Sequence, residues 1–249
     1  MIPMKILGVS LFFATTSASS VLSAAELIKD ETDRNKSFIT WGAQVEEFEY
    51  RYSDDDQELA VWNADLFYGT DELKVRLLSK GEYSLTEDKY EGLENQIVGQ
   101  IPISSFFDAK AGVRFDSPNG PDRAYAVAGI SGLAPQWFEV DANLFLSDEG
   151  NWSSSIDAEY EVLFTNYLVL TANLDATAAF NEDSEIGVGE GLVSTETGLR
   201  LSYDVVDRLF SPYIGVVYER KYGDSADLAV DEGNSTSNWL GVLGARFVF

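Results

Sequence analysis

The chain has no histidine and no cysteine, and its two methionines, Met1 and Met4, both lie at the N-terminal end. Without cysteine no disulfide framework forms. Without histidine, serine has no imidazole base beside it and stays a weak nucleophile. Paired carboxylates would need two acids placed across a substrate cleft, and no spacing in the sequence marks such a pair. We therefore expect that the protein is not an enzyme.

Basic side chains are also scarce: 17 Lys and Arg stand against 42 Asp and Glu, a formal net charge of −25 at pH 7. A nucleic-acid partner would require a basic face, so we expect none. Long hydrophobic runs are missing after residue 25. A helix that spans a bilayer needs roughly 20 apolar residues, so a helical membrane protein is excluded. An acidic exterior suits contact with salt and cations.

Residues 1–25 have the composition of a secretory signal peptide. Lys5 is their only charge, residues 6–14 form a short apolar core, and small residues at 23–25 precede Glu26 as a cleavage site. Residues 26–38 are polar and charged without a period, which predicts a periplasmic N-terminal tether. We expect residues 39–249 to form a single domain.

The last eleven residues alternate with a period of two. Counting back from Phe249, every second position is apolar or small: Phe247, Ala245, Leu243, Gly241 and Trp239. This alternation predicts a β-strand. A terminal strand that ends on an aromatic residue is typical of an outer-membrane barrel, in which the closed sheet leaves no backbone group unpaired in lipid.

The same alternation predicts twelve strands, near 39–52, 62–68, 73–77, 93–101, 107–116, 124–131, 138–146, 156–162, 168–175, 196–204, 213–219 and 239–249. The phase slips in the first strand, which predicts a bulge at Glu46 and Glu47. Connections after the even strands are tight, and most of those after the odd strands are longer and acidic, with 181–191 and 223–235 the largest.

Short turns at one end and long loops at the other are typical of outer-membrane barrels. Aromatic residues also gather near the segment ends, as in the girdles at the two membrane interfaces: Trp41, Tyr52, Trp62, Tyr68, Trp137, Trp152, Tyr203, Tyr218 and Trp239. We therefore predict an all-β protein: a transmembrane antiparallel up-and-down β-barrel of about 12 strands. It would lie in the outer membrane of a Gram-negative cell, in contact with outer-membrane lipid and with both termini in the periplasm.

The face opposite the apolar one is charged and is predicted to line the bore. The candidate pore-lining residues are Asp65, Arg76, Asp108, Arg114, Glu139, Asp141, Asp157, Glu159, Glu161, Glu196, Arg200, Glu219 and Arg246. Two interpretations stay open for a barrel of this size. Interleaved ion pairs fill the lumen as a plug, or the surplus of acids lines a narrow passage that prefers cations.

Several ordered stretches resemble the copper resistance protein B family of outer-membrane proteins. They are 109–114 (AKAGVR), 132–142 (GLAPQWFEVDA), 158–161 (AEYE), 187–192 (GVGEGL), 198–203 (GLRLSY), 212–216 (PYIGV) and 220–223 (RKYG). The resemblance spans residues 41–249. It implies a role in copper homeostasis and tolerance together with periplasmic partners such as a multicopper oxidase or a copper carrier.

The resemblance implies copper as the ion handled, with no tightly bound cofactor and an unknown metal site. The barrel would be an acid-lined cation passage or a docking site for those partners. The alternative is a generic small-solute pore or structural barrel without copper binding. Copper prefers sulfur and imidazole ligands, and the chain after residue 25 offers only oxygen donors. Acids in 181–191 and 224–232 leave Ca²⁺ binding as a further option, although no known calcium-loop spacing is present.

Overall fold

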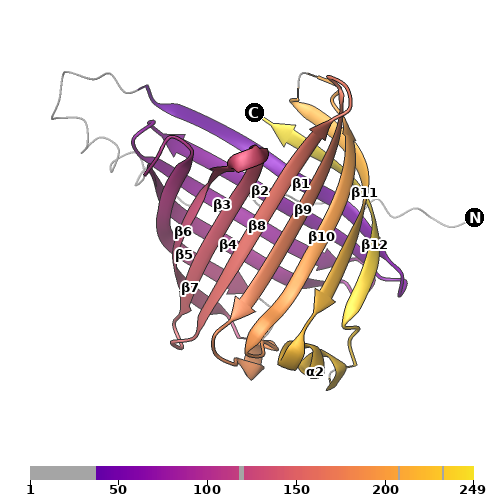
Figure 1. The fold of residues 1–249 in the computed structure, drawn as a ribbon. Coiled ribbons are helices and arrows are strands. Elements are labelled where there is room, and N and C mark those ends of the chain that lie inside the picture. The colour runs from indigo at the N-terminus through magenta and orange to yellow at the C-terminus, as the bar shows by residue number, and fades with distance from the viewer. Residues whose placement is uncertain (1–37, 118–120, 207, 232) are drawn as a thin grey trace, which may run out of the picture. The chain divides into compact units, whose positions relative to one another are not determined.

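The computed structural model describes residues 38–117, 121–206, 208–231 and 233–249, and within these ranges twelve antiparallel strands close into a barrel (Figure 1). The strands are β1 (Thr40–Ser53), β2 (Glu58–Gly69), β3 (Lys74–Ser84), β4 (Lys89–Pro102), β5 (Phe107–Ser117), β6 (Arg123–Ala134), β7 (Phe138–Ser147), β8 (Trp152–Leu163), β9 (Leu168–Ala179), β10 (Gly191–Tyr203), β11 (Phe210–Lys221) and β12 (Ser237–Val248). Each strand pairs with the next along the chain, and β12 pairs with β1. The predicted up-and-down barrel is confirmed. The predicted signal peptide, and the predicted tether up to residue 37, lie outside the described residues.

The barrel is apolar outside and polar inside. Large hydrophobic side chains on the outer face are solvent-accessible, such as Ile214 at 62% and Leu243 at 61%. Charged side chains on the inner face are buried, such as Arg51 at 2% and Glu49 at 4%. A water-soluble sheet would reverse this arrangement, whereas a membrane barrel requires it. The period-two sequence pattern produces it because alternate side chains point to opposite faces of a strand.

The first strand carries the predicted bulge. Its register against β2 shifts between Val45 and Glu47, and against β12 between Val45 and Glu49. The extra residue lets β1 keep its aromatic residues outside on both sides of the shift. The seam with β12 is closed at its end by two backbone hydrogen bonds between Ala43 and Phe249, of 3.1 and 2.8 Å.

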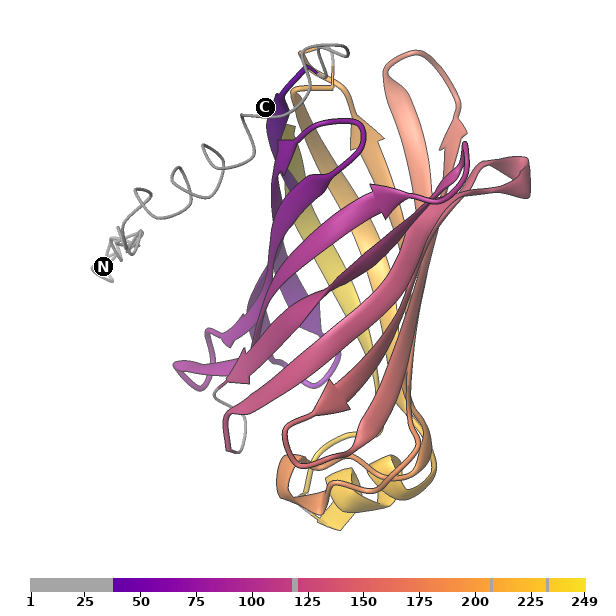
Figure 2. The same ribbon diagram turned by 90° about the vertical axis from the view of Figure 1, so that its left-hand side faces the viewer.

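The two ends of the barrel differ less in loop length than the sequence predicted. Connections 54–57, 85–88 and 148–151 are as short as the turns at the opposite end, because the strands continue through the acidic residues assigned to loops. The length asymmetry comes from 180–190, which contains η2 (Ser184–Ile186), and from 222–236, which contains α2 (Gly223–Asp231). Figure 2 shows both segments gathered at one end, which we call the loop end, and the C-terminus at the other, the turn end.

The turn end includes η1 (Pro135–Trp137), in which Gln136 and Trp137 have positive φ angles of 66° and 68°. Of the nine aromatic residues expected near strand ends, Trp62 lies within its strand and not at the end. Its ring lies over Gly81 of β3, where an added Cβ would meet ring atoms at 2.0 Å. No helix within the described ranges has the length and apolar content needed to cross a membrane.

Candidate functional site: the bore of the barrel

Described residues of the bore line two large cavities. The turn-side cavity, of about 660 Å³, reaches the turn residues Ser105, Phe106 and Arg208. The loop-side cavity, of about 450 Å³, extends to Glu91 and Lys221 near the loop end. Eight carboxylates and three basic side chains line the first cavity, and ten carboxylates and six basic side chains line the second, among the described residues. Both walls therefore carry a surplus of negative charge, which raises the local concentration of cations.

A row of acids crosses five adjacent strands on the inner face. Direct cross-strand neighbours are Asp141 with Asp157, Asp157 with Asp175, Asp175 with Glu196, and Glu196 with Glu219. Like charges placed directly opposite each other destabilise a sheet by roughly 0.2–1 kcal/mol a pair. This row is therefore not explained by strand pairing. Arg51 contacts Glu196 and Glu219, and Lys110 contacts Asp141, so basic side chains offset part of its charge.

Beside this row, a buried ion-pair network joins β1 to β10 and β11. The Glu49 carboxylate, whose side chain is 0% exposed, accepts hydrogen bonds from Arg51 Nε and Arg200 Nε at 2.6 Å each and from the Tyr213 hydroxyl at 2.8 Å. Arg200 Nη1 also donates to Asn173 Oδ1 at 2.6 Å. Removing one partner from such a pair costs about 3–5 kcal/mol, because the other charge stays buried. The network is a fixed part of the wall.

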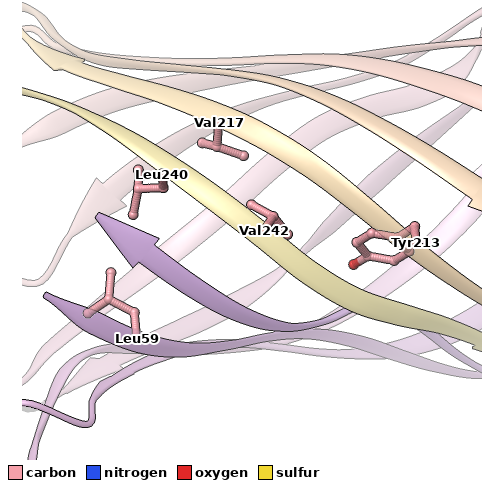
Figure 3. Packing of buried hydrophobic residues seen from close by; sticks show 5 residues of the cluster. All are labelled: Leu59, Tyr213, Val217, Leu240 and Val242. Atoms are coloured by element: carbon pink, nitrogen blue, oxygen red, sulfur yellow. The ribbon is translucent and has the colours of Figure 1, made fainter. Parts of the chain in front are cut away.

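Buried apolar side chains pack next to this network, which Tyr213 joins to them. Leu59, Tyr213, Val217, Leu240 and Val242 form a buried cluster on the inner faces of β2, β11 and β12 (Figure 3). A second cluster, of Val98, Val127 and Phe145, lies on the inner faces of β4, β6 and β7. Together with the ion pairs, these clusters fill part of the bore beside the two cavities.

Two further inward basic side chains, Arg76 of β3 and Lys110 of β5, are also paired. Arg76 donates to Asp65 and, at 3.2 Å, to Gln100. Lys110 contacts both oxygens of Asp141 at 2.7 and 2.5 Å.

Arg114 stacks on two aromatic rings while it pairs with acids. Its guanidinium carbon lies 4.8 Å from the Phe145 ring centre and 5.3 Å from that of Tyr125. It also contacts Glu94 at 2.8 Å and Asp116 at 2.6 Å. Contacts on every side fix this guanidinium against the wall, away from both cavities.

The two cavities meet at a place that we call the neck. Among the described lining residues, Glu46, Asp157, Glu159 and Arg246 line both cavities. Glu46 is at the β1 bulge, Arg246 is on the terminal strand, and the two other acids are on β8. Arg246 Nη2 donates to Glu159 at 3.2 Å, and Nη1 donates to Glu161 at 3.1 Å. The side chains of this pair are 24% and 26% exposed. This pair is half-buried, and solvent screens it more than the buried network.

Eleven of the thirteen predicted pore-lining residues line a cavity. Arg76, Asp108, Glu139, Asp141 and Glu161 line the first, Glu196, Arg200 and Glu219 the second, and Asp157, Glu159 and Arg246 both. Asp65 does not, because it is buried against Arg76, and neither does Arg114. That these residues conduct ions stays a prediction.

Sequence reasoning missed four inward side chains of β1: Glu46, Glu47, Glu49 and Arg51. The signal was present, because Phe48, Tyr50 and Tyr52 alternate after the phase slip and leave Glu49 and Arg51 on the opposite face. The bulge also turns Glu46 and Glu47 inward together, and the loop-side cavity is lined by both.

The described residues contain no group of three or more acids arranged to hold a metal ion. They also include no histidine, cysteine or methionine. The residues present do not fit a resident copper centre, since carboxylate and carbonyl oxygens suit harder cations.

The fold and the charged bore define an outer-membrane β-barrel. The solved NanC porin is similar to this chain over 84% of its length and 99% of the porin, with a TM-score of 0.52 and 11% sequence identity. At that identity the likeness shows the fold alone.

The chain belongs to the copper resistance protein B family. The family model described as "Copper resistance protein B precursor (CopB)" matches residues 39–249. It is 33% identical over 213 residues to the copper resistance protein B of Escherichia coli, covering 86% of this chain and 71% of the relative. It is 32% identical over 205 residues to the copper resistance protein B homolog of Pseudomonas syringae pv. tomato, covering 82% and 68%. The resemblance noted in the sequence is therefore confirmed.

Proposed function

We propose that this outer-membrane barrel is a non-catalytic passage for cations that serves copper tolerance, with both termini in the periplasm. The observation that carries the proposal is the surplus of carboxylates over basic groups in both cavities. Rings of carboxylates favour cations over anions in a pore. Membership of the copper resistance protein B family supplies the physiological context.

Copper is the cargo in this proposal and is not a resident cofactor. Oxygen ligands hold Cu(II) weakly in comparison with imidazole and thiolate. Weak binding at several places along a path is what conduction requires. The acid row on β7 to β11 offers such places, and periplasmic copper proteins, a multicopper oxidase or a copper carrier, would receive or supply the ion at the turn end.

The test is the reversal potential of the purified barrel in a planar bilayer under a salt gradient. We expect a potential of the sign that marks cation preference. Glu139→Gln, in the wall of the turn-side cavity, should reduce this preference, and Glu149→Gln, at the loop end and 61% exposed, should leave it unchanged. Anion preference, or no current, would overturn the proposal. In cells, deletion of the gene should lower growth across a copper series.

A structural barrel without a passage is the second candidate, and the buried network and apolar clusters of the inner wall favour it. In that case the reconstituted barrel should give no current, and Glu139→Gln should have no effect on conductance. Copper tolerance would then depend on the partners that the barrel binds.

A further inference from the structure

The neck brings one basic side chain among several acids at the junction of the two cavities. Arg246 extends from β12 to Glu159 and Glu161 of β8. The strands β9, β10 and β11 separate β8 from β12 in the sheet. The side chain therefore reaches over the interior of the bore and is not paired with a neighbouring strand.

The backbone around the neck explains why the Arg246 side chain can extend across the bore. The cross-strand register of β1 and β12 is interrupted between the pairs Val45 with Phe247 and Glu49 with Gly244. Arg246 lies within this interruption on β12, and Glu46 lies within it on β1. The bulge thus adds a carboxylate at the place where Arg246 leaves the wall.

The Arg246 pair is accessible to the water of the bore. The side chains of Arg246, Glu159 and Glu161 are 24%, 26% and 29% exposed, whereas those of Arg51 and Glu49 are 2% and 0% exposed. Solvent reaches this half-buried pair, so another cation can replace the guanidinium while the carboxylates stay in contact with water. The buried network has no such freedom.

We propose that Arg246 determines the selectivity of the bore by acting as a tethered counter-ion, so that a divalent cation is bound only briefly at the neck. This inference rests on the proposed passage. The guanidinium occupies the carboxylates that a permeating cation would use, and each passing ion must displace it. Conduction needs sites that release the ion again, and a competing internal charge provides that release.

Replacing Arg246 should lengthen the time that a divalent cation spends at the neck. In Arg246→Gln, Glu159 and Glu161 lose their ion-pair partner and Glu46 loses a nearby positive charge. Lys80 stays near Asp157 in this variant. Mn²⁺ should then bind roughly tenfold more tightly. The repulsion between a divalent ion and a positive charge a few ångströms away exceeds the free energy of a tenfold change in affinity, even in a solvated site. The potassium current should become larger in the absence of Mn²⁺ and should be blocked by low concentrations of it.

Two measurements test this on the full barrel refolded in detergent and in planar bilayers. Mn²⁺ binding is followed by its electron paramagnetic resonance signal, and block is followed in the potassium current. Arg246→Lys, which keeps the charge, should stay close to wild type in both. Lys89→Gln also removes one positive charge, but from the loop end, where Lys89 pairs with Glu87 at 2.7 Å and is 54% exposed; it should match wild type.

An Arg246→Gln barrel that binds Mn²⁺ as weakly as wild type and shows no added block would overturn the inference while leaving the passage intact. Equal changes in Lys89→Gln would also overturn it, because net charge alone would then explain the effect. A wild-type barrel without cation-selective current overturns the proposed passage itself, and that result is obtained before any variant is measured. Heat-modifiable migration on gels checks that each variant is folded.

Discussion

At the scale of single residues, the charged side chains of the bore fall into two kinds that exposure separates. Glu49 and its partners Arg51 and Arg200 are removed from water and hold one another. Gly198 makes room for them, since an added Cβ would meet Asn173 Oδ1 at 2.2 Å and Arg200 Nη1 at 2.6 Å. Arg246 and its glutamates remain in contact with bore water. The first kind stabilises the barrel, and the second kind is free to exchange partners.

Glu49→Gln should therefore be strongly destabilising. Two guanidiniums would lose their shared buried carboxylate, and the expected loss in the free energy of unfolding is about 3–5 kcal/mol. Urea unfolding of the barrel in lipid vesicles measures it. The matched change Glu87→Gln breaks an exposed pair with Lys89 and should cost at most about 1 kcal/mol. Equal losses in the two variants would contradict the distinction.

At the scale of elements, the β1 bulge connects the sheet to the neck. One additional residue restores the phase of the strand, so that Phe48, Tyr50 and Tyr52 face outward as Trp41 does. The same residue supplies the Glu46 carboxylate at the junction of the cavities. The bulge therefore keeps β1 in register with its neighbours and places one more carboxylate in the bore.

Deleting Glu46 should leave a folded barrel. Val45 would remain outside and Glu47 inside, and the ladders of β1 with β2 and with β12 would become continuous. Deleting Ala64 from β2, which has no bulge, should prevent folding, because a one-residue slip moves every following side chain to the opposite face. Heat-modifiable migration and circular dichroism of the two deletions decide this. Loss of the barrel in both would show that the bulge is required for the fold itself.

At the scale of the whole molecule, the barrel is inverted in polarity relative to a soluble protein. Ile97 on β4 is 49% exposed, and a soluble protein would tolerate lysine at such a position. In a bilayer, Ile97→Lys should cost about 2–4 kcal/mol if the site lies near the midplane. Gln96→Lys, one residue away and facing the bore, should cost far less. Unfolding in vesicles compares the two, and equal costs would contradict the assignment of the faces.

Much of this architecture is determined by the sequence alone. Alternation with a period of two is local, so the outward and inward faces of most strands, and the bulge in the first, are readable without coordinates. The strand predicted near 124–131, where neither face is clearly polar, is present as β6 and extends over Arg123–Ala134. The acid surplus of the inner face follows from the same alternation. Loop lengths are harder to predict from the sequence. A strand continues past its last apolar residue wherever the backbone of its polar residues still pairs with the neighbouring strand.

Only the tertiary structure decided which inward charges meet. Arg246 and Glu159 are 87 residues apart in sequence and become neighbours only when the sheet closes and its strands tilt. Asp65 and Arg114 face inward like the other predicted residues, yet packing against Arg76 and against aromatic rings removes them from the cavities. Whether an inward charge lies buried in the wall or faces open water depends on contacts across the bore, and those contacts have no counterpart in the local pattern of a single strand.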